Sequence, residues 1–366
     1  MKLAFVYITG RLARLADTEA SLSAREFFYG ALEIKERGHK VAFYEVNDGI
    51  NAAPAGWIVE TLYRFHLMPS KTNSSLLNQL WKLLPVLNRT DVVVATTSGI
   101  AYGLGVLKAI GQLRVPIVAI HCGIVNYKLK RRRQLLNGML LRRMWTQLYG
   151  EGELDLARNM FRVPADRIEV NQFGVDTKFW RPSHNVSGDY ILAVGNDAHR
   201  DYALLLDVAS QTDFRYILVT RHNLNPLPSN VEVLYGDWHA MAISDEKLRG
   251  LYQKAKLVVV PLHDTDQPSG QSVCLQAMAC GKAVVLTRIR GLWSHAMMSA
   301  GENVVMVAPG NEPELHNAIY RLAMDDVERS RIGRNARETV CREADISRFS
   351  RRLEKLCERV LATSNA

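Results

Sequence analysis

A loop rich in Pro, Ser and Gly lies between two β-branched runs in the second half of the chain. The first run ends at Pro261, the loop reaches Gly270, and an apolar stretch with helical spacing continues to Gly281 before the second run, Val284-Val285. The loop is therefore expected where a parallel strand ends and a helix begins, and free N–H groups there favour an anion. The alternative is a loop that only connects the strand to the helix and binds no ligand. We predict phosphate binding by Ser269, Gly270, Gln271, Ser272 and Val273.

The segment from Pro268 to Val285 resembles the core of the family 4 glycosyltransferases, GT-B enzymes that move a sugar from a nucleotide donor. That family usually carries a Glu, a second Glu eight residues later, Ala-Met-Ala-Cys-Gly and a Val-Val strand. Here Ala277 to Gly281 match, whereas the acidic positions hold Pro268 and Gln276. The resemblance implies that Gln276 contacts the donor ribose through its amide. Asp264 and Asp266 are the candidates to replace the first Glu.

The loop after the predicted strand 190–194 is a second candidate for binding the donor. In the family, this loop offers an Arg directly after a Gly and a Lys or Arg several residues on, both of which reach the pyrophosphate. Asn196 stands at the first position and Arg200 fits the second. A guanidinium can bond two phosphate oxygens at once. The resemblance implies that Arg200 and Asn196 bind the donor; an ordinary surface arginine is the alternative.

The first half opens with a βαβ pattern: a strand over 3–8, a helix over 23–38 and a strand over 40–46. The resemblance implies that Gly10 and Arg11, in the first loop, approach the acceptor or a phosphate, with solvated surface as the alternative for Arg11. His121 ends the predicted strand 115–120, at a sheet edge where sites of α/β proteins form. The family commonly has a His here facing the donor sugar, so His121 is the candidate catalytic residue; a structural histidine is the alternative.

Residues 121–150 include no Asp or Glu and many basic residues. Apolar residues such as Leu135, Met139 and Trp145 are interleaved with them. On a helix this composition is typical of a segment lying on an anionic membrane. An ordinary helix with solvated arginines is the alternative. The candidate membrane contacts are Lys130, Arg131, Arg132, Arg133, Arg142 and Arg143.

The length of 366 residues suits two α/β domains. The block from Gly174 to Pro182 resembles the segment with which family members leave the first domain, and the composition of 180–188 favours a linker. We predict domains at 1–182 and 183–340 and a helix at 341–366. The resemblance implies that this helix packs back on the first domain. The expected fold is α/β of the GT-B type, with two Rossmann-like doubly wound domains facing a central cleft.

Composition limits the partners. A net charge of +9 and a pI near 9.3 indicate an anionic partner, and no nucleic-acid-binding motif accompanies the charge. Five cysteines without paired spacing argue against disulfides and zinc. No apolar run approaches membrane-spanning length, and the N-terminus runs into a strand, so we expect a cytoplasmic protein, with peripheral attachment to the inner membrane face as a further expectation.

The resemblance implies a hexosyltransferase-type glycosyltransferase that uses a UDP- or GDP-sugar as co-substrate and retains the anomeric configuration. It implies no cofactor and no required metal. The basic segment favours a lipid-linked acceptor, with a saccharide acceptor as the other possibility. Two alternatives remain open: a GT-B nucleotide-sugar 2-epimerase, and a non-catalytic nucleotide-binding or membrane-docked partner subunit, which the absence of both family glutamates favours.

Overall fold

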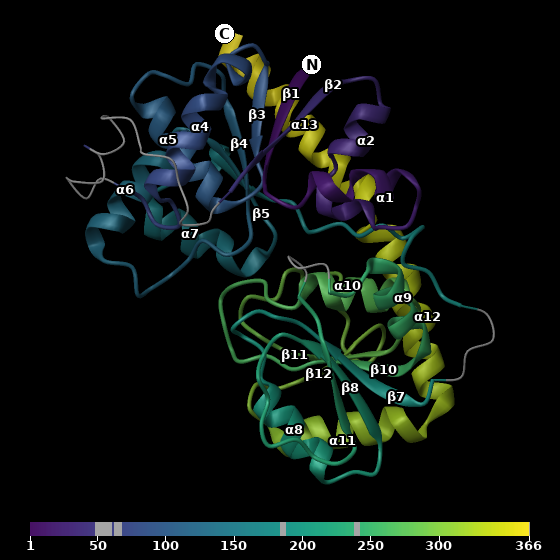
Figure 1. Cartoon of the computed structure of the whole chain (residues 1–366). Coiled ribbons are helices and arrows are strands. Elements are labelled where there is room, and N and C mark those ends of the chain that lie inside the picture. The colour runs from purple at the N-terminus through teal and green to yellow at the C-terminus, as the bar shows by residue number, and fades with distance from the viewer. Residues whose placement is uncertain (48–60, 62–67, 184–187, 238–241, 366) are drawn as a thin grey trace. The chain divides into compact units, whose positions relative to one another are not determined.

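The computed structural model describes residues 1–47, 61, 68–183, 188–237 and 242–365, and the chain forms two compact units (Figure 1). Unit 1 consists of Met1–Leu15, Phe27–Gln172 and Phe349–Ala366, and unit 2 of Ala16–Glu26 and Phe173–Arg348. We predicted limits at 182 and 340; the chain passes between the units after Gln172 and after Arg348. The short segment Ala16–Glu26, which lies early in the chain, is part of unit 2.

Unit 1 contains a parallel sheet of order β2-β1-β3-β4-β5-β6 among the described residues. The strands are β1 (Lys2–Ile8), β2 (Lys40–Val46), β3 (Val92–Ala95), β4 (Ile117–His121), β5 (Trp145–Leu148) and β6 (Ile168–Val170). The order reverses between β1 and β3, so the loops that follow these two strands diverge. In doubly wound sheets ligands bind at this switch point.

Two helices of unit 1, α4 and α5, begin at polar residues whose side chains cap them. Asn73 accepts a hydrogen bond from Leu76 N at the start of α4, and Thr97 accepts one from Ile100 N at the start of α5. The helices are α2 (Ala31–Glu36), α4 (Ser74–Leu87), α5 (Ser98–Ala109), α6 (Arg131–Leu141), α7 (Leu154–Phe161) and most of α13 (Ile346–Asn365).

The helix predicted over 23–38 is divided. A 3₁₀ turn covers Arg25–Phe28, and α2 starts only at Ala31, because Tyr29 and Gly30 both have a positive φ. A Cβ added at Gly30 would lie 2.7 Å from Ser350 Cβ. The prediction of one helix was therefore wrong: glycine here allows a left-handed turn and a close approach of α13 that the helical spacing of apolar residues did not reveal.

Unit 2 contains a second parallel sheet, of order β12-β11-β10-β7-β8-β9 in the described part of the chain. Its strands are β7 (Tyr190–Val194), β8 (Arg215–Thr220), β9 (Val231–Tyr235), β10 (Ala255–Val260), β11 (Val284–Thr287) and β12 (Val305–Val307). The order reverses between β7 and β10. The two loops that were predicted to bind the donor follow these two strands, so they meet at the switch point of this sheet.

The helices of unit 2 have side-chain caps at most of their starts: Asp201, Ser244, Asn311 and Asp325 each accept a hydrogen bond from a backbone N–H of the first turn. The helices are α8 (Tyr202–Ser210), α9 (Asp245–Lys254), α10 (Gln271–Ala279), α11 (Glu312–Met324) and α12 (Asp326–Glu343), and α1 (Leu15–Glu19) begins at the junction of the units. Within the described ranges, no helix combines the length and the apolar character needed to cross a bilayer.

Candidate functional site

The predicted phosphate loop of unit 2 has the local structure expected from its sequence. It follows β10 and ends at Gly270, whose φ of 76° is left-handed, and α10 begins at the next residue. α10 begins at Gln271, so the N–H groups of its first turn have no carbonyl one turn earlier in the helix to accept their hydrogen bonds. Ser269 and Gln271 are buried and Ser272 is partly exposed. The loop therefore presents N–H donors at the carboxyl edge of the sheet.

Arg200 lies against this loop. Its side chain is only 3% exposed, and Nε lies 2.9 Å from Asp197 Oδ2. A Cβ on Gly195 would come within 2.0 Å of Nε and one on Gly270 within 3.2 Å of Nη1, so two glycines leave the space that the guanidinium occupies. Nη1 is buried and has no hydrogen-bond partner among the described residues. A buried guanidinium with an unused donor beside a helix N-terminus is suited to an anionic ligand.

Asp197 holds Arg200 and the loop together. Its Oδ1 accepts hydrogen bonds from Ser269 Oγ at 2.6 Å and from His199 N at 3.1 Å. Burial by itself would raise the pKa of Asp197, but the Arg200 guanidinium and the Ser269 hydroxyl outweigh burial and lower it. Asp197 is therefore ionised and positions both candidate phosphate-binding groups. Sequence reasoning missed this residue, although its spacing of three from Arg200 was visible.

Two predicted donor contacts have partners inside unit 2. Asn196 Nδ2 donates to Gly236 O at 2.5 Å, and Asn196 Oδ1 accepts from Arg221 N at 2.7 Å. Gln276 Oε1 accepts from the Tyr252 hydroxyl at 3.3 Å, and its Nε2 donates to Glu26 Oε1 at 3.1 Å. Each amide thus already has a donor and an acceptor, and Gln276 is only 3% exposed. Among the described residues, these hydrogen bonds join neither side chain to Arg200.

Glu26, which sequence reasoning did not select, is the centre of that second polar cluster. Its Oε1 also accepts from Trp180 Nε1 at 2.6 Å, and its Oε2 accepts from Asp176 N at 3.0 Å. Burial, with the nearby Asp176 carboxylate, raises the pKa of Glu26 to about 8. A buried carboxyl therefore takes the position next to Gln276, and no sequence signal connects residues that lie so far apart in the chain.

Asp264 and Asp266 are paired with the same arginine. Arg290 Nε lies 2.8 Å from Asp264 Oδ2, and Arg290 Nη1 lies 3.5 Å from Asp266 Oδ1. These pairings account for both carboxylates that could replace the family glutamate. Among the described residues, the one set of three possible metal-binding side chains is His39, Glu354 and Glu358, in unit 1, and Arg37 Nε already contacts Glu354 there.

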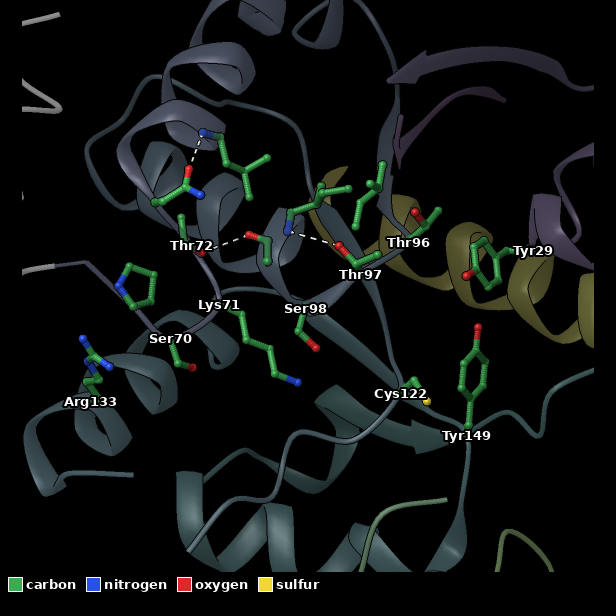
Figure 2. A pocket seen from close by; sticks show the side chains of 16 residues that line it. Tyr29, Ser70, Lys71, Thr72, Thr96, Thr97, Ser98, Cys122, Arg133 and Tyr149 are labelled. Atoms are coloured by element: carbon green, nitrogen blue, oxygen red, sulfur yellow. Dashed lines mark hydrogen bonds between the residues drawn. The ribbon is translucent and has the colours of Figure 1, made fainter. Parts of the chain in front are cut away.

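A cavity of about 660 Å³ lies in unit 1, at the switch point of the first sheet (Figure 2). Its described lining residues come from the ends of β1, β3, β4 and β5, from the starts of α4, α5 and α6, from the loop before α4 and from the turn before α2. They are Ile8, Tyr29, Pro69, Ser70, Lys71, Thr72, Asn73, Leu76, Thr96, Thr97, Ser98, Gly99, Ile100, Cys122, Arg133 and Tyr149. None of them is acidic, and two, Lys71 and Arg133, are cationic.

His121 lies directly behind this cavity. It is fully buried, its Nδ1 is 2.9 Å from the hydroxyl of Ser98, and Nε2 has no partner within the described part of the chain. Burial, assisted by the Lys71 ammonium, lowers the pKa of His121 to about 3. The imidazole is therefore neutral near pH 7. It orients Ser98 and is not a lining residue in this conformation, so its catalytic role stays a prediction.

Gly10 and Arg11 follow β1. Gly10 has a φ of 102°, and a Cβ there would meet nothing within 4 Å. The Arg11 guanidinium lies over the ring of Phe27 at 5.2 Å and donates to the Tyr29 hydroxyl at 3.3 Å. Arg11 thus packs on aromatic rings, and through Tyr29 it contacts a lining residue of the cavity.

The basic segment forms a shorter helix than the sequence suggested. α6 ends at Leu141 and does not include Trp145, which begins β5, where Arg167 lies over its ring at 4.6 Å. Arg142 and Arg143 donate to the carbonyls of Phe161 and Met139. We define the α6 surface as the exposed residues Arg131, Arg132, Leu135, Met139, Arg142 and Arg143. Lys130 precedes the helix, and Arg133 turns to the cavity.

The comparisons with known proteins agree with this architecture. Residues 191–325, most of unit 2, match a family model described as Glycosyl transferases group 1. No curated protein sequence matches the chain. The match covers part of the second half of the chain, which is similar there to group 1 glycosyltransferases, and the family 4 subtype is not part of that result.

Solved structures of similar fold cover both units. HepE of Anabaena in complex with UDP-glucose has 17% identity and a TM-score of 0.69 over 98% of this chain and all of that chain. Sucrose-phosphate synthase of Thermosynechococcus elongatus has 15% identity and a TM-score of 0.71, covering 99% of this chain and 100% of that one. WaaG, a glycosyltransferase involved in lipopolysaccharide biosynthesis, has 13% identity and a TM-score of 0.64, covering 98% and 99%. These likenesses confirm the predicted GT-B fold with two Rossmann-like domains.

Proposed function

We propose that this protein is a glycosyltransferase of hexosyltransferase type that takes a sugar from a UDP- or GDP-sugar and transfers it, with retention of configuration, to a lipid-linked or saccharide acceptor. The observation that supports the proposal most directly is Arg200 Nη1, a buried donor without a described partner beside the N-terminus of α10. This position lies in the segment that matches the group 1 glycosyltransferase model. A nucleoside diphosphate would supply the missing acceptors.

In the proposed reaction, the bond between the anomeric carbon and the donor phosphate oxygen breaks, and a bond to an acceptor hydroxyl oxygen forms. The hydroxyl proton passes to the departing phosphate, and a nucleoside diphosphate is released. Arg200 and the N–H groups of Gln271 and Ser272 stabilise the negative charge that grows on the leaving phosphate. Preorganisation by Asp197 and by the two glycines means that these donors need little rearrangement during the step.

The experiment is a thermal unfolding series with UDP, GDP, ADP and TDP. A nucleotide at about 100 times its Kd stabilises the native state by roughly 2.7 kcal/mol, so one of the four is expected to raise Tm. Arg200→Gln is expected to abolish that shift. Arg215→Gln is the matched control, because Arg215 is exposed on β8 and pairs with Glu232. The proposal is wrong if no nucleotide shifts Tm, or if the Arg200 variant responds as the natural chain does.

A specific observation also supports a second candidate, a non-catalytic nucleotide-binding partner subunit. Gln276 is occupied by Tyr252 and Glu26, Asp264 and Asp266 are paired with Arg290, and Pro268 has no polar side chain. Release of sugar from UDP-glucose or the matching GDP-sugar separates the two candidates. Turnover identifies a transferase, whereas nucleotide binding without any turnover, in the presence of candidate acceptors, favours the partner subunit.

A further inference from the structure

We infer that the cavity of unit 1 binds the phosphate group of a phosphorylated sugar acceptor, through Lys71 and Arg133. This inference rests on the proposed function, because it identifies the acceptor of that reaction by its chemistry. The shared chemistry is a sugar that carries a phosphate or diphosphate, either free or at the head of a lipid. Neither the family match, which begins at residue 191, nor any compared protein's name assigns this cavity.

The charges in and around the cavity favour an anion. Lys71 and Arg133 both line it, and no described lining residue is acidic. The Lys71 ammonium donates to Gly123 O at 2.9 Å and keeps two further protons for other acceptors. Figure 2 shows the Lys71 side chain extending from its loop toward Ser98 and Cys122. The lining of the cavity is therefore cationic, while the buried Glu153 carboxyl lies behind it, near enough to Lys71 to interact with it electrostatically.

The loop that carries Lys71 is held on both sides. Thr72 Oγ1 donates to Gly99 O at 3.1 Å at the start of α5, and Ser70 Oγ accepts from Asn137 Nδ2 of α6 at 2.6 Å. Lys71 itself has a φ of 59°, which costs a non-glycine residue free energy. A Cβ at Gly99 would lie 2.4 Å from Lys71 O, so the loop and the helix start are in direct contact. The structure thus fixes the position of a strained, charged residue at the cavity wall.

Two helices begin at the same wall and add backbone donors. The side chains of Asn73 and Thr97 accept hydrogen bonds from Leu76 N and Ile100 N at the starts of α4 and α5, and the first N–H groups of a helix have no intrahelical acceptor. These N–H groups and the positive ends of two helices act in addition to Lys71 and Arg133. Removal of either cation is therefore expected to weaken, and removal of both to abolish, the binding of a phosphate.

The remainder of the cavity suits a sugar. Its volume of about 660 Å³ lies within the usual range of small-molecule sites, well above the need of a phosphate alone. Tyr29 and Tyr149 lie together at the end of the cavity away from Arg133 (Figure 2). Aromatic rings with hydroxyl groups offer both a stacking surface and hydrogen bonds to a saccharide. The cationic end would hold the phosphate, and the tyrosine end the sugar that it carries.

The test uses the full chain and inorganic pyrophosphate as the probe, titrated by calorimetry. Because pyrophosphate also fits the proposed donor site, the titrations are made in the Arg200→Gln background. We expect binding to remain there and to weaken at least tenfold on adding Lys71→Gln or Arg133→Gln. Binding is expected to be unchanged by Arg114→Gln, an exposed arginine of the same unit that does not line the cavity. Equal affinities in all four chains, or an equal loss with Arg114→Gln, would overturn the inference. Circular dichroism checks that each variant is folded.

The outcomes separate this inference from the proposed function. If UDP binding to the natural chain fails but Lys71-dependent pyrophosphate binding persists, the proposed function falls and the anion site stands. If UDP binds and the Arg200→Gln chain takes up no pyrophosphate, the inference falls and the donor site stands. Competition by glucose 6-phosphate supports a free sugar phosphate, and competition by geranyl diphosphate supports a lipid-linked one; competition by neither contradicts the assignment of the cavity to a phosphorylated acceptor.

Discussion

At the scale of single residues, buried polar atoms that lack a hydrogen-bond partner are the most informative. Arg200 Nη1 and His121 Nε2 are buried without described partners, yet they differ in charge. Arg200 carries a permanent positive charge, so an anion is the natural occupant. His121 is neutral because burial and Lys71 lower its pKa to about 3, so it can donate or accept a hydrogen bond but not supply a charge near pH 7.

Glu26 predicts a pH dependence of stability. Its pKa rises from about 4.5 to about 8 on folding, so the folded state binds more protons between these values. The stability that it contributes is complete at pH values below its unfolded pKa and is lost as the pH rises through about 8. The slope is at most about 1.4 kcal/mol per pH unit.

Glu26→Gln is expected to flatten this profile. Urea unfolding monitored at several pH values from about 6 to about 9 measures the slope directly. The free energy of unfolding of the variant is expected to be lower at every pH, because Asp176 N loses an acceptor. Such a loss costs about 1–3 kcal/mol. Glu153, whose pKa burial raises to about 7, leaves part of the dependence in place. A variant whose stability falls as steeply as that of the natural chain would contradict the assignment.

At the scale of elements, α6 departs from the usual charge rule for helices. Three arginines occupy its first turn and no acidic residue is present there, although the N-terminal end of a helix favours negative charge. The α6 surface also exposes Leu135 by 59% and Met139 by 46%. Exposed apolar side chains among arginines suit an anionic lipid surface, and the unfavourable charge at the helix start would serve docking there.

We therefore expect flotation with vesicles containing anionic phosphatidylglycerol, and loss of flotation with Arg131→Glu and Arg132→Glu. Each basic residue near such a surface contributes about 1 kcal/mol, so the double charge reversal is expected to weaken binding more than tenfold. The matched control is Arg351→Glu with Arg352→Glu, two exposed neighbours on α13 of the same unit. Equal flotation of the two double variants would exclude α6 as the docking element.

At the scale of the whole molecule, the end of the chain completes the first unit. Residues 349–366 belong to unit 1, and five of them are buried apolar side chains: Phe349, Leu353, Leu356, Cys357 and Val360. Glu354 accepts hydrogen bonds from Arg37 and His39, both at 2.6 Å. Asn171 also donates to Phe349 O at 3.1 Å. Unit 1 therefore depends on a segment that follows unit 2 in the sequence.

A chain that ends at Arg348 is expected to lose the folded form of unit 1. Each buried apolar side chain contributes about 1.5–3 kcal/mol, so the sum is comparable with the whole stability of a domain. A chain that ends at Leu361 is the control, because residues 362–364 are exposed. Limited proteolysis with mass spectrometry should show cleavage within residues 1–172 of the shorter chain only. Equal resistance of both chains would contradict this view of α13.

Local pattern was sufficient for the elements and for the position of part of the proposed donor site. β-branched runs, a loop ending in Gly270 and a helix to Ala279 are encoded within a few residues of one another, and free N–H groups at the start of α10 follow from helix geometry alone. The doubled βαβ pattern likewise determined the two parallel sheets and, with the resemblance, the GT-B fold. Sequence spacing also placed Arg200 correctly, at the switch point, because the loop after a strand must lie at that sheet edge.

Only the tertiary structure decided which of the selected side chains are available to a ligand. Gln276 is engaged by Glu26, which lies 250 positions away, and Asn196 by Gly236. Lys71 reaches the cavity because Gly99 and Asn137 hold its loop from two different helices. Such partners meet by packing, which carries no local sequence period, and burial then determines the charge of groups such as His121 and Glu26. Availability and charge are therefore properties of the fold.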